Sequence, residues 1–257
     1  MTLYQAVILA IVEGVTEFLP ISSTGHLVLV ATLLHIQQTD FVKSFEITIQ
    51  LGAILAVAAL YFRLLTRNFH IWKSLLTAFF PSMVVGLVFY KIIKTALLGN
   101  PYITLLMLLL GGIAILILEK RYTSLKSHTQ SVENVTRKQA LLIGLCQSVS
   151  VIPGVSRAAA TILGGMYVGL TRRSAVEFSF LLAFPTMAGA SALDLYGSYS
   201  SFSGDNMFLL GVGFVVAFFV ALLTMKWLLT FVKTQTFTPF GVYRILLSIF
   251  YYLFVLA

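Results

Sequence analysis

The stretch Glu13–His26 reads EGVTEFLPISSTGH and places two carboxylates, a proline, several hydroxyl groups and a histidine within one short interval. Uncharged apolar sequence lies on both sides of it, over Met1–Val12 and Leu27–Leu34. Ionisable residues inside a membrane segment are energetically costly, so they mark a functional site by default. The remainder of the chain is therefore interpreted as scaffold or partner for this stretch.

Composition assigns the chain to the integral membrane proteins. Of its 257 residues, 59% are hydrophobic and 10% are charged, whereas a soluble domain carries about 25% charged residues. The net charge of +8 comes from Lys and Arg in short loops between apolar runs, which the positive-inside rule explains. No nucleic-acid partner is expected, because that would require a basic soluble face. Cys146 is the only cysteine, which excludes an intrachain disulfide and a thiolate metal cluster.

Six apolar runs have the length of membrane-spanning helices. They are Phe45–Leu64, Ser74–Tyr90, Tyr102–Leu118, Ser174–Leu195, Met207–Met225 and Phe240–Val255. The opening stretch, Met1–Leu34, differs because its two apolar arms are each shorter than the roughly 20 residues that a span requires. Two short arms around a polar break predict a re-entrant helix pair, with a single kinked span as the alternative. A re-entrant tip is tolerated only where protein or a wet cavity surrounds it.

A second interrupted apolar stretch, Gln139–Leu170, breaks at Pro153–Arg157 and resembles the first. The matching positions keep their order along the chain: Gln5-Ala6 with Gln139-Ala140, Glu13 with Gln147, Pro20 with Pro153, Ser23 with Ser156, and Glu46 with Glu177. This order predicts one all-α polytopic membrane domain, 1–257, built by duplication. Repeat one covers about 1–118, a cytoplasmic loop about 119–138, and repeat two about 139–257. Each repeat is expected to hold a re-entrant pair and about three transmembrane helices.

The distribution of Lys and Arg orients the two repeats in the membrane. If Phe45–Leu64 runs from outside to inside, most basic residues fall inside: Arg63, Arg67, Lys73, Lys120, Arg121, Lys126, Arg137, Lys138, Arg172, Arg173, Lys226, Lys233 and Arg244. Lys43, Lys91 and Lys94 fall outside, and the outer segment Tyr196–Asn206 has no basic residue. Both termini then lie outside, and the repeats are inverted in topology. Inverted repeats with broken elements bind ligands near the midplane, where they meet.

Glu13 and Glu17 lie one helical turn apart, on one helix face. Two ionised carboxylates side by side at membrane depth repel each other, so they require a cation or a shared proton. A divalent ion with hard oxygen ligands, Mg²⁺ or Ca²⁺, fits this requirement and often bridges to substrate phosphates; Mn²⁺ is a further option. The alternative is that both carboxylates reach interfacial water or cap neighbouring backbone.

Pro20 begins a polar turn in which Ser22, Ser23 and Thr24 offer hydroxyls and free amides at the start of a helix. Such a helix N-terminus is an anion site, although serine and threonine are also ordinary helix caps. His26 lies just inside this helix, beside the carboxylates and the hydroxyls, and is a candidate catalytic residue. The first broken element therefore offers acids together with a nucleophile or base.

Arg157 follows the second break, in the sequence Pro-Gly-Val-Ser-Arg. An arginine at membrane depth requires an anionic partner, and phosphate suits its forked donors. A salt bridge to Glu13 or Glu17 is the alternative. Ser156 and Thr161 are either helix caps or donors to phosphate oxygens, and Gly154 belongs to the same turn. The second broken element therefore predicts an anion clamp that complements the first.

These two motifs together resemble the undecaprenyl-diphosphate phosphatase family of the bacitracin-resistance type. That family carries an ExxxE motif running into PxSSTGH and a second PGxSRSxxT motif, which match EGVTEFLPISSTGH and PGVSRAAAT here. The resemblance covers the whole chain in length and layout. One departure is Ala158-Ala159, where the family commonly has Ser-Gly, so a hydroxyl is lost at that position.

The resemblance implies metal-dependent hydrolysis of undecaprenyl diphosphate to the monophosphate and phosphate, which recycles the cell-wall lipid carrier in the bacterial inner membrane. It implies an active site open to the outer face. Glu13 and Glu17 would handle the metal and protons, Arg157 would hold the diphosphate, and Ser23 and His26 would form the attacking pair. Which of the two attacks stays open. Gly154, Ser22, Thr24, Ser156 and Thr161 are expected at the substrate.

Two alternatives to this function were weighed. The phosphatidic-acid phosphatase type has a histidine and an aspartate after its Ser-Arg, whereas the places after Ser156-Arg157 hold Leu163 and Tyr167, so this alternative fails. The second is a lipid-phosphate transporter or flippase, which inverted repeats by themselves also suggest. The paired carboxylates with serine and histidine favour hydrolysis, and fold analogy cannot decide between them. A homodimer is compatible with the sequence.

Overall fold

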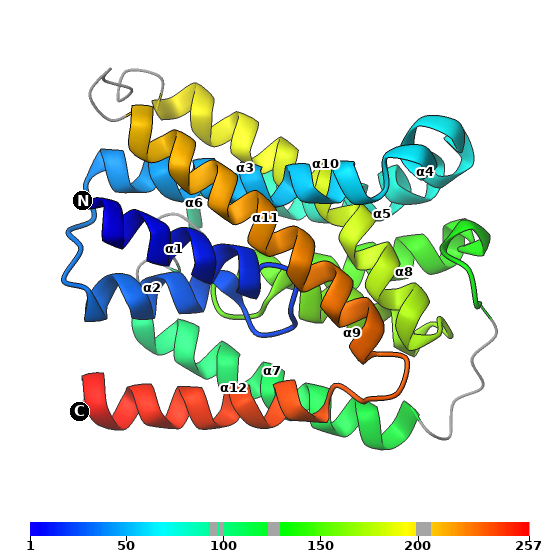
Figure 1. Cartoon of the computed structure of the whole chain (residues 1–257). Coiled ribbons are helices and arrows are strands. Elements are labelled where there is room, and N and C mark those ends of the chain that lie inside the picture. Colours follow the sequence, from blue (N-terminus) through cyan, green and yellow to red (C-terminus); the bar gives the residue numbers. More distant parts are fainter. Residues whose placement is uncertain (93–96, 98–99, 123–128, 199–206, 257) are drawn as a thin grey trace.

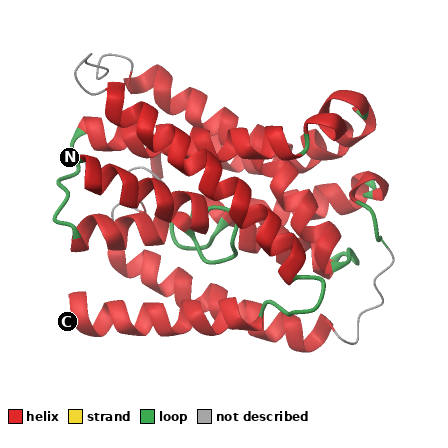
Figure 2. Ribbon diagram, in the orientation of Figure 1, coloured by secondary structure: helices red, strands yellow, loops and turns green. Residues whose placement is uncertain are grey.

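The chain folds into a bundle of helices, seen in the computed structural model of Figure 1, which describes residues 1–92, 97, 100–122, 129–198 and 207–256. The helices are α1 Leu3–Thr16, α2 Ser23–Leu33, α3 Asp40–Leu60, α4 Phe62–Arg67, α5 Phe69–Val88, α6 Tyr90–Ile92, α7 Pro101–Tyr122, α8 Arg137–Ser148, α9 Arg157–Tyr167, α10 Arg172–Ser198, α11 Met207–Phe231 and α12 Thr238–Tyr251. Short helical turns follow at η2 Val132–Asn134, η3 Val149–Val151 and η6 Tyr252–Leu256. Within these ranges the only β pairing is an isolated bridge from Thr129 to Leu170 (Figure 2).

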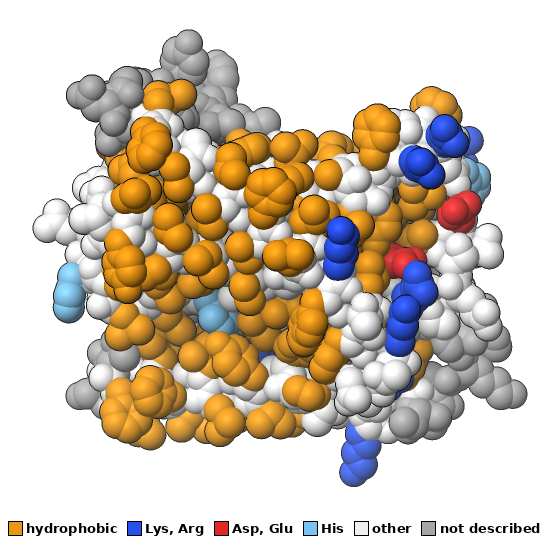
Figure 3. Space-filling view, in the orientation of Figure 1, with side chains coloured by type: hydrophobic (Ala, Val, Ile, Leu, Met, Phe, Trp, Pro, Cys, Tyr) orange, Lys and Arg blue, Asp and Glu red, His pale blue; other side chains and the backbone are white. Residues whose placement is uncertain are grey.

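Five of the six predicted spans fall on the long helices α3, α5, α7, α10 and α11, and the sixth falls on α12, whose 14 residues continue into η6. Four of them, α3, α5, α7 and α11, are long and apolar enough to cross a membrane. Apolar side chains cover much of the surface in Figure 3, where a soluble protein would show only small patches. The prediction of an all-α polytopic membrane protein is confirmed.

The predicted broken stretches form two pairs of short helices, α1 with α2 and α8 with α9. The longest of the four, α1, has 14 residues, which at 1.5 Å per residue is about 21 Å and less than the roughly 30 Å hydrocarbon core. In Figure 1 the chain reverses between α1 and α2, which pack against each other. The first stretch is therefore a helical hairpin, and the alternative of one kinked span is wrong.

The two helical hairpins agree in local detail. α1 begins with a capping box of Thr2 and Gln5, and α8 begins with one of Thr136 and Gln139. The side-chain amide of Gln5 also donates to the carbonyl of Leu34 at 3.2 Å. In the second hairpin the amide of Gln139 donates to the carbonyl of Val168 at 3.0 Å. Each glutamine thus ties the start of its hairpin to the end of the returning helix.

Helices of the first half pack on helices of the second half. α1 lies against α11, α8 against α5, and α12 against α7. Close approach depends on small residues at the crossings: a Cβ at Gly14 of α1 would come within 2.9 Å of the Ala217 carbonyl oxygen of α11. In the same way, a Cβ at Gly144 of α8 would come within 2.9 Å of the Ala78 Cα of α5. These crossings hold both hairpins inside the bundle.

An ion pair between a buried carboxylate and a partly exposed arginine lies at the end of the molecule opposite the chain termini. Glu119 of α7 accepts from Arg172 of α10 at 2.6 Å and from the Phe237 backbone amide at 2.7 Å. Both termini lie together at the other end, on the left of Figure 1. On the face shown in Figure 3, basic side chains gather towards the end without the termini. Lys94, Lys126 and the part of the predicted outer segment from 199 to 206 lie outside the described residues.

Candidate active site

The two predicted carboxylates occupy the end of α1 and differ in their surroundings. Glu13 is 1% exposed, and neither of its oxygens has a hydrogen-bond partner among the described residues. Glu17, at the C-terminal cap of α1, is also buried but fully engaged. Because an unpartnered buried carboxylate is costly, the oxygens of Glu13 are candidate ligands for a cation in the interior.

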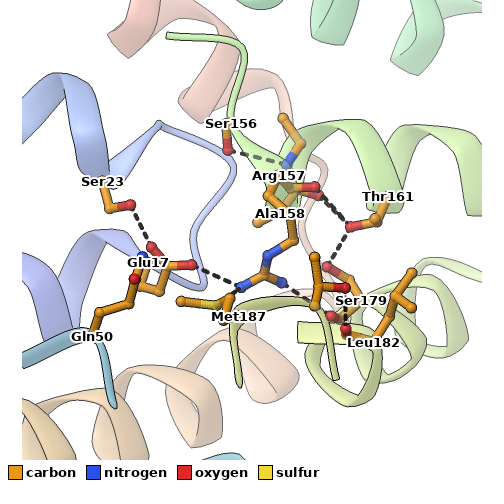
Figure 4. Close-up of polar contacts among 12 residues, drawn as sticks. Glu17, Ser23, Gln50, Ser156, Arg157, Ala158, Thr161, Ser179, Leu182 and Met187 are labelled. Carbon is orange, nitrogen blue, oxygen red and sulfur yellow. Dashed lines mark hydrogen bonds and ion pairs between the residues drawn. The ribbon is translucent and has the colours of Figure 1, made fainter. Parts of the chain in front are cut away.

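Glu17 joins the two hairpins. Its Oε2 accepts a hydrogen bond from the hydroxyl of Ser23, the first residue of α2. Its Oε1 accepts from Nη2 of Arg157, the first residue of α9, at 2.8 Å. The side chains of Arg157 and Glu17 are only 11% and 6% exposed. Figure 4 shows the resulting line from the hydroxyl through the carboxylate to the guanidinium. The salt bridge considered for Arg157 is thus present, with Glu17.

The rest of the Arg157 side chain is held by α10. Nη1 donates to the carbonyl of Ser179 at 3.0 Å, and Nη2 also contacts the sulfur of Met187 at 3.2 Å. Nε is buried and has no partner among the described residues. Thr161 supports the same corner, because its hydroxyl lies 2.6 Å from that of Ser179 and donates to the Arg157 carbonyl at 2.9 Å. The Nε–H of the guanidinium is therefore available to a ligand.

Ser22 and Ser156 act as helix caps and shape the two turns in the same way. The Ser22 hydroxyl accepts from the Gly25 amide at 3.5 Å, and the Ser156 hydroxyl accepts from the Ala159 amide at 3.1 Å. Their φ angles are 75° and 73°, a left-handed conformation that is uncommon for residues other than glycine. Such strain persists where the surroundings impose it, and it clusters at functional sites. Thr24, by contrast, is exposed.

His26 stands apart from Ser23 and pairs with α12. Its Nδ1 lies 2.8 Å from the Ser22 carbonyl oxygen, and its Nε2 lies 2.8 Å from the hydroxyl of Tyr243. A carbonyl only accepts, so Nδ1 carries the proton and Nε2 of the neutral ring accepts from Tyr243. The two rings are nearly parallel, with centroids 5.6 Å apart. The predicted pair of Ser23 and His26 is therefore not hydrogen bonded in this structure; Ser23 pairs with Glu17 instead.

Comparison with known proteins places this arrangement in a family. The family model described as bacitracin resistance protein BacA matches residues 6–250. The chain belongs to the BacA family. A relative from Aquifex aeolicus, named undecaprenyl-diphosphatase, is 50% identical over the whole of both chains. Relatives of the same name from Sulfurihydrogenibium sp. (51% identical, covering 98% of this chain and 99% of the relative) and Persephonella marina (46%, covering 100% of both) are similarly close.

Sequence reasoning missed several residues at the site of this BacA-family chain. Tyr243 and Ser179 lie in helices outside both motifs, and a single hydroxyl in such a helix gives no local signal of a site. Arg244 was counted only among the basic residues that orient the chain, although it falls within the predicted span Phe240–Val255. It lies within α12, is fully buried, and donates to backbone carbonyls in the interior. A basic residue surrounded by apolar sequence, inside a helical run, was the signal available for it.

The carboxylates of Glu13 and Glu17 fit a hard divalent cation whose remaining ligands come from the substrate and water. No group of three histidine, cysteine or acidic side chains in the described part of the chain is arranged to hold a metal. Mg²⁺, however, is commonly bound through one or two carboxylates, with water and substrate phosphates completing the shell. The unpartnered oxygens of Glu13, next to Glu17, are the groups that would supply these protein ligands. Gly154, in the second turn, offers its backbone rather than a side chain.

Proposed function

We propose that this chain hydrolyses undecaprenyl diphosphate to undecaprenyl phosphate and inorganic phosphate, recycling the lipid carrier of the bacterial cell wall. The observation that carries the proposal is the junction of the Ser23 hydroxyl, the Glu17 carboxylate and the Arg157 guanidinium, drawn from both hairpins into the buried interior. A nucleophile, a base and an anion clamp in contact are the parts that phosphoryl transfer needs. The name carried by the relatives agrees with this chemistry.

In the proposed reaction Ser23 is the nucleophile. Its hydroxyl already donates to Glu17, so Glu17 takes the proton as Oγ attacks the terminal phosphorus. The bond from that phosphorus to the bridging oxygen breaks, and undecaprenyl phosphate leaves. Water then attacks the phosphoserine, the bond from phosphorus to Ser23 Oγ breaks, and Oγ takes back the proton held by Glu17 as inorganic phosphate leaves with both protons of the water. Both ring nitrogens of His26 face other groups, which favours Ser23 over His26 as the attacking group.

Arg157 has two roles in this proposal. Its free Nε and its forked Nη groups hold the diphosphate. To bind the substrate in this way, Arg157 must exchange the carboxylate of Glu17 for the phosphate oxygens, which suit its forked donors equally well. Charge developing on the phosphoryl oxygens is stabilised by a guanidinium that the protein has already oriented, usually the largest contribution to catalysis. In this proposal the salt bridge of Arg157 with Glu17 is the arrangement before the substrate binds.

A divalent cation, Mg²⁺, Ca²⁺ or Mn²⁺, is part of the proposal. Glu13 and Glu17 would hold it, and when bound it neutralises diphosphate charge. Glu13 gives the stronger support, because its buried oxygens have no other partner in the described part of the structure. The predicted contacts of Ser22, Thr24, Gly154, Ser156 and Thr161 with substrate stay predictions.

We further propose that the domain consists of two inverted-topology repeats with re-entrant hairpins, about 1–118 and 139–257. The matching glutamine ties and the matching turns of Ser22 and Ser156 support it. In Figure 1, α1 enters from the end that bears the termini and α8 from the opposite end. Basic residues gather towards the latter, so we place the termini and the active-site opening on the outer side of the inner membrane. We also propose that the protein forms a homodimer, which light scattering in detergent would detect.

The function is tested by phosphate release from undecaprenyl diphosphate in detergent, with and without EDTA. We expect release that EDTA stops and that Glu17→Gln and Arg157→Ala each abolish. Glu177→Gln and Arg173→Ala are the matched controls, because this i,i+4 pair on α10 lies outside the site, and they should keep activity. No release by folded wild-type protein under any metal would refute the proposal. The transporter alternative predicts that outcome, but the relatives bear the name of a hydrolase and give it no support.

A further inference from the structure

Arg244 is a completely buried arginine in the middle of α12. Among the described residues it forms no ion pair with an acidic group. Burying a charge without a partner is strongly unfavourable, so the side chain must be stabilised in another way. Its five N–H donors, the full complement of a guanidinium, all bond to backbone carbonyl oxygens at 2.9 to 3.2 Å.

The carbonyl groups come from three separate segments. Met107 and Leu108 of α7 accept from Nη2 and Nε. The other three belong to the two turns of the active site: Pro20 and Val155 accept from Nη1, and Gly154 accepts from Nη2. One planar side chain therefore joins the turn before Ser23 to the turn before Arg157, with α7 as a fixed support.

The sequence of α7 makes room for this guanidinium. At Gly111 an added Cβ would collide with Nη2 of Arg244 and come within 2.7 Å of its Cζ. At Gly112 a Cβ would lie 2.7 Å from the Gly241 carbonyl oxygen of α12. The two adjacent glycines, otherwise unfavourable inside a helix, thus let the guanidinium lie against the α7 backbone and let α12 approach.

The Arg244 bonds differ from the other link between the turns, the ion pair of Glu17 with Arg157. That ion pair is made by reacting groups, so it must open when the diphosphate binds Arg157. The Arg244 bonds use backbone carbonyls that take no part in the chemistry, so they persist through turnover. A link of this kind can keep Ser23 and Arg157 at a constant separation while their own contact is broken.

We propose that Arg244 is a positioning residue for the phosphatase reaction, holding the turns at Pro20 and Gly154–Val155 in register so that Ser23 meets the phosphorus held by Arg157. This role rests on the proposed function. It requires arginine, because five donors in one plane reach five carbonyl groups, whereas lysine has three donors on a single nitrogen. Each turn keeps its own serine cap, so Arg157 can still bind the diphosphate when Arg244 is lost. The position of Ser23 relative to Arg157, however, is then no longer fixed.

The test compares kcat and KM of Arg244→Met and Arg244→Lys with wild type in detergent, using undecaprenyl diphosphate. Because a misplacement of about 1 Å can cost about 100-fold in rate, we expect kcat to fall by about that factor in Arg244→Met. KM should change far less, since Arg157 still binds the diphosphate. Arg244→Lys should lie closer to Arg244→Met than to wild type. Thermal unfolding of each variant establishes that the measured protein is folded.

Two further variants separate positioning from general stability. Gly111→Ala displaces the guanidinium without removing it and should lower kcat in the same way, whereas Gly86→Ala, whose added Cβ meets nothing within 4 Å, should not. Arg172→Met removes a partly exposed arginine, which bonds the buried Glu119 at the far end of the bundle. It should lower the unfolding temperature and leave kcat of the folded protein unchanged. If Arg244→Met does not fold, kcat of Gly111→Ala and Arg244→Lys tests the positioning role instead.

Wild-type kcat in folded Arg244→Lys and Gly111→Ala would overturn the positioning role while leaving the phosphatase in place. An equal loss of kcat in Arg172→Met would also overturn it, because any loss of stability would then have the same effect. Absence of phosphate release from wild type is a different result, which refutes the proposed function and this role with it.

Discussion

At the scale of single residues, the two candidate nucleophiles are distinguished by their partners. Ser23 donates to a carboxylate, whereas His26 contacts a carbonyl and the Tyr243 hydroxyl. We expect acid quenching during turnover of substrate labelled in its terminal phosphate to trap an acid-stable phosphoserine. Ser23→Ala should remove that label and phosphate release with it. His26→Gln should keep the label at a lower level. An acid-labile label that persists in Ser23→Ala would identify a phosphohistidine and contradict this assignment.

Glu13 is the second residue whose surroundings predict a measurable effect. Its buried oxygens have no partner among the described residues, so the bound cation would depend on it more than on any engaged group. Disturbing even the outer shell of a metal site typically costs 10- to 100-fold in affinity. Glu13→Gln should therefore raise the Mg²⁺ concentration that gives half-maximal activity by at least about tenfold. Glu177→Gln, a carboxylate change outside the site, should leave that concentration unchanged. An unchanged value in Glu13→Gln would remove Glu13 from the metal site.

At the scale of helices, the position of α1 depends on a glycine contact. A Cβ at Gly14 would lie 2.8 Å from the Val220 Cβ and 2.9 Å from the Ala217 carbonyl of α11. Gly14→Ala should push α1 away, costing about 1–3 kcal/mol of stability as overpacked sites do. Because Glu13 and Glu17 move with α1, kcat should also fall, by up to about 100-fold. The control is Gly211→Ala in α11, where the added Cβ meets nothing within 4 Å. Equal activity of the two variants would contradict this coupling.

The same scale explains what the sequence could predict. The length of an apolar run is read from consecutive residues, so it predicts a helix without any knowledge of how the chain packs. All six predicted spans accordingly fall on observed helices. The two motifs also located Glu17, Ser23 and Arg157 correctly as one cluster. The partner of His26 could not be predicted, because Tyr243 lies 217 positions away and only packing brings it near. The contacts of Arg244 were missed for a related reason: a count of charges does not distinguish an arginine in a loop from one whose donors are satisfied by buried carbonyls.

At the scale of the whole molecule, orientation in the membrane decides which side the substrate comes from. The connection between α2 and α3 lies at the same end as both termini in Figure 1, and η2 with the start of α8 lies at the opposite end. In a Cys146→Ala background, Gln37→Cys and Asn134→Cys place single exposed thiols at these two ends. A membrane-impermeant maleimide should label Gln37→Cys in intact cells and Asn134→Cys only after permeabilisation. The reverse pattern would place the termini and the hairpin of Ser23 on the inner side. Hydrolysis would then draw on lipid diphosphate at the cytoplasmic face, and the positive-inside assignment would be wrong.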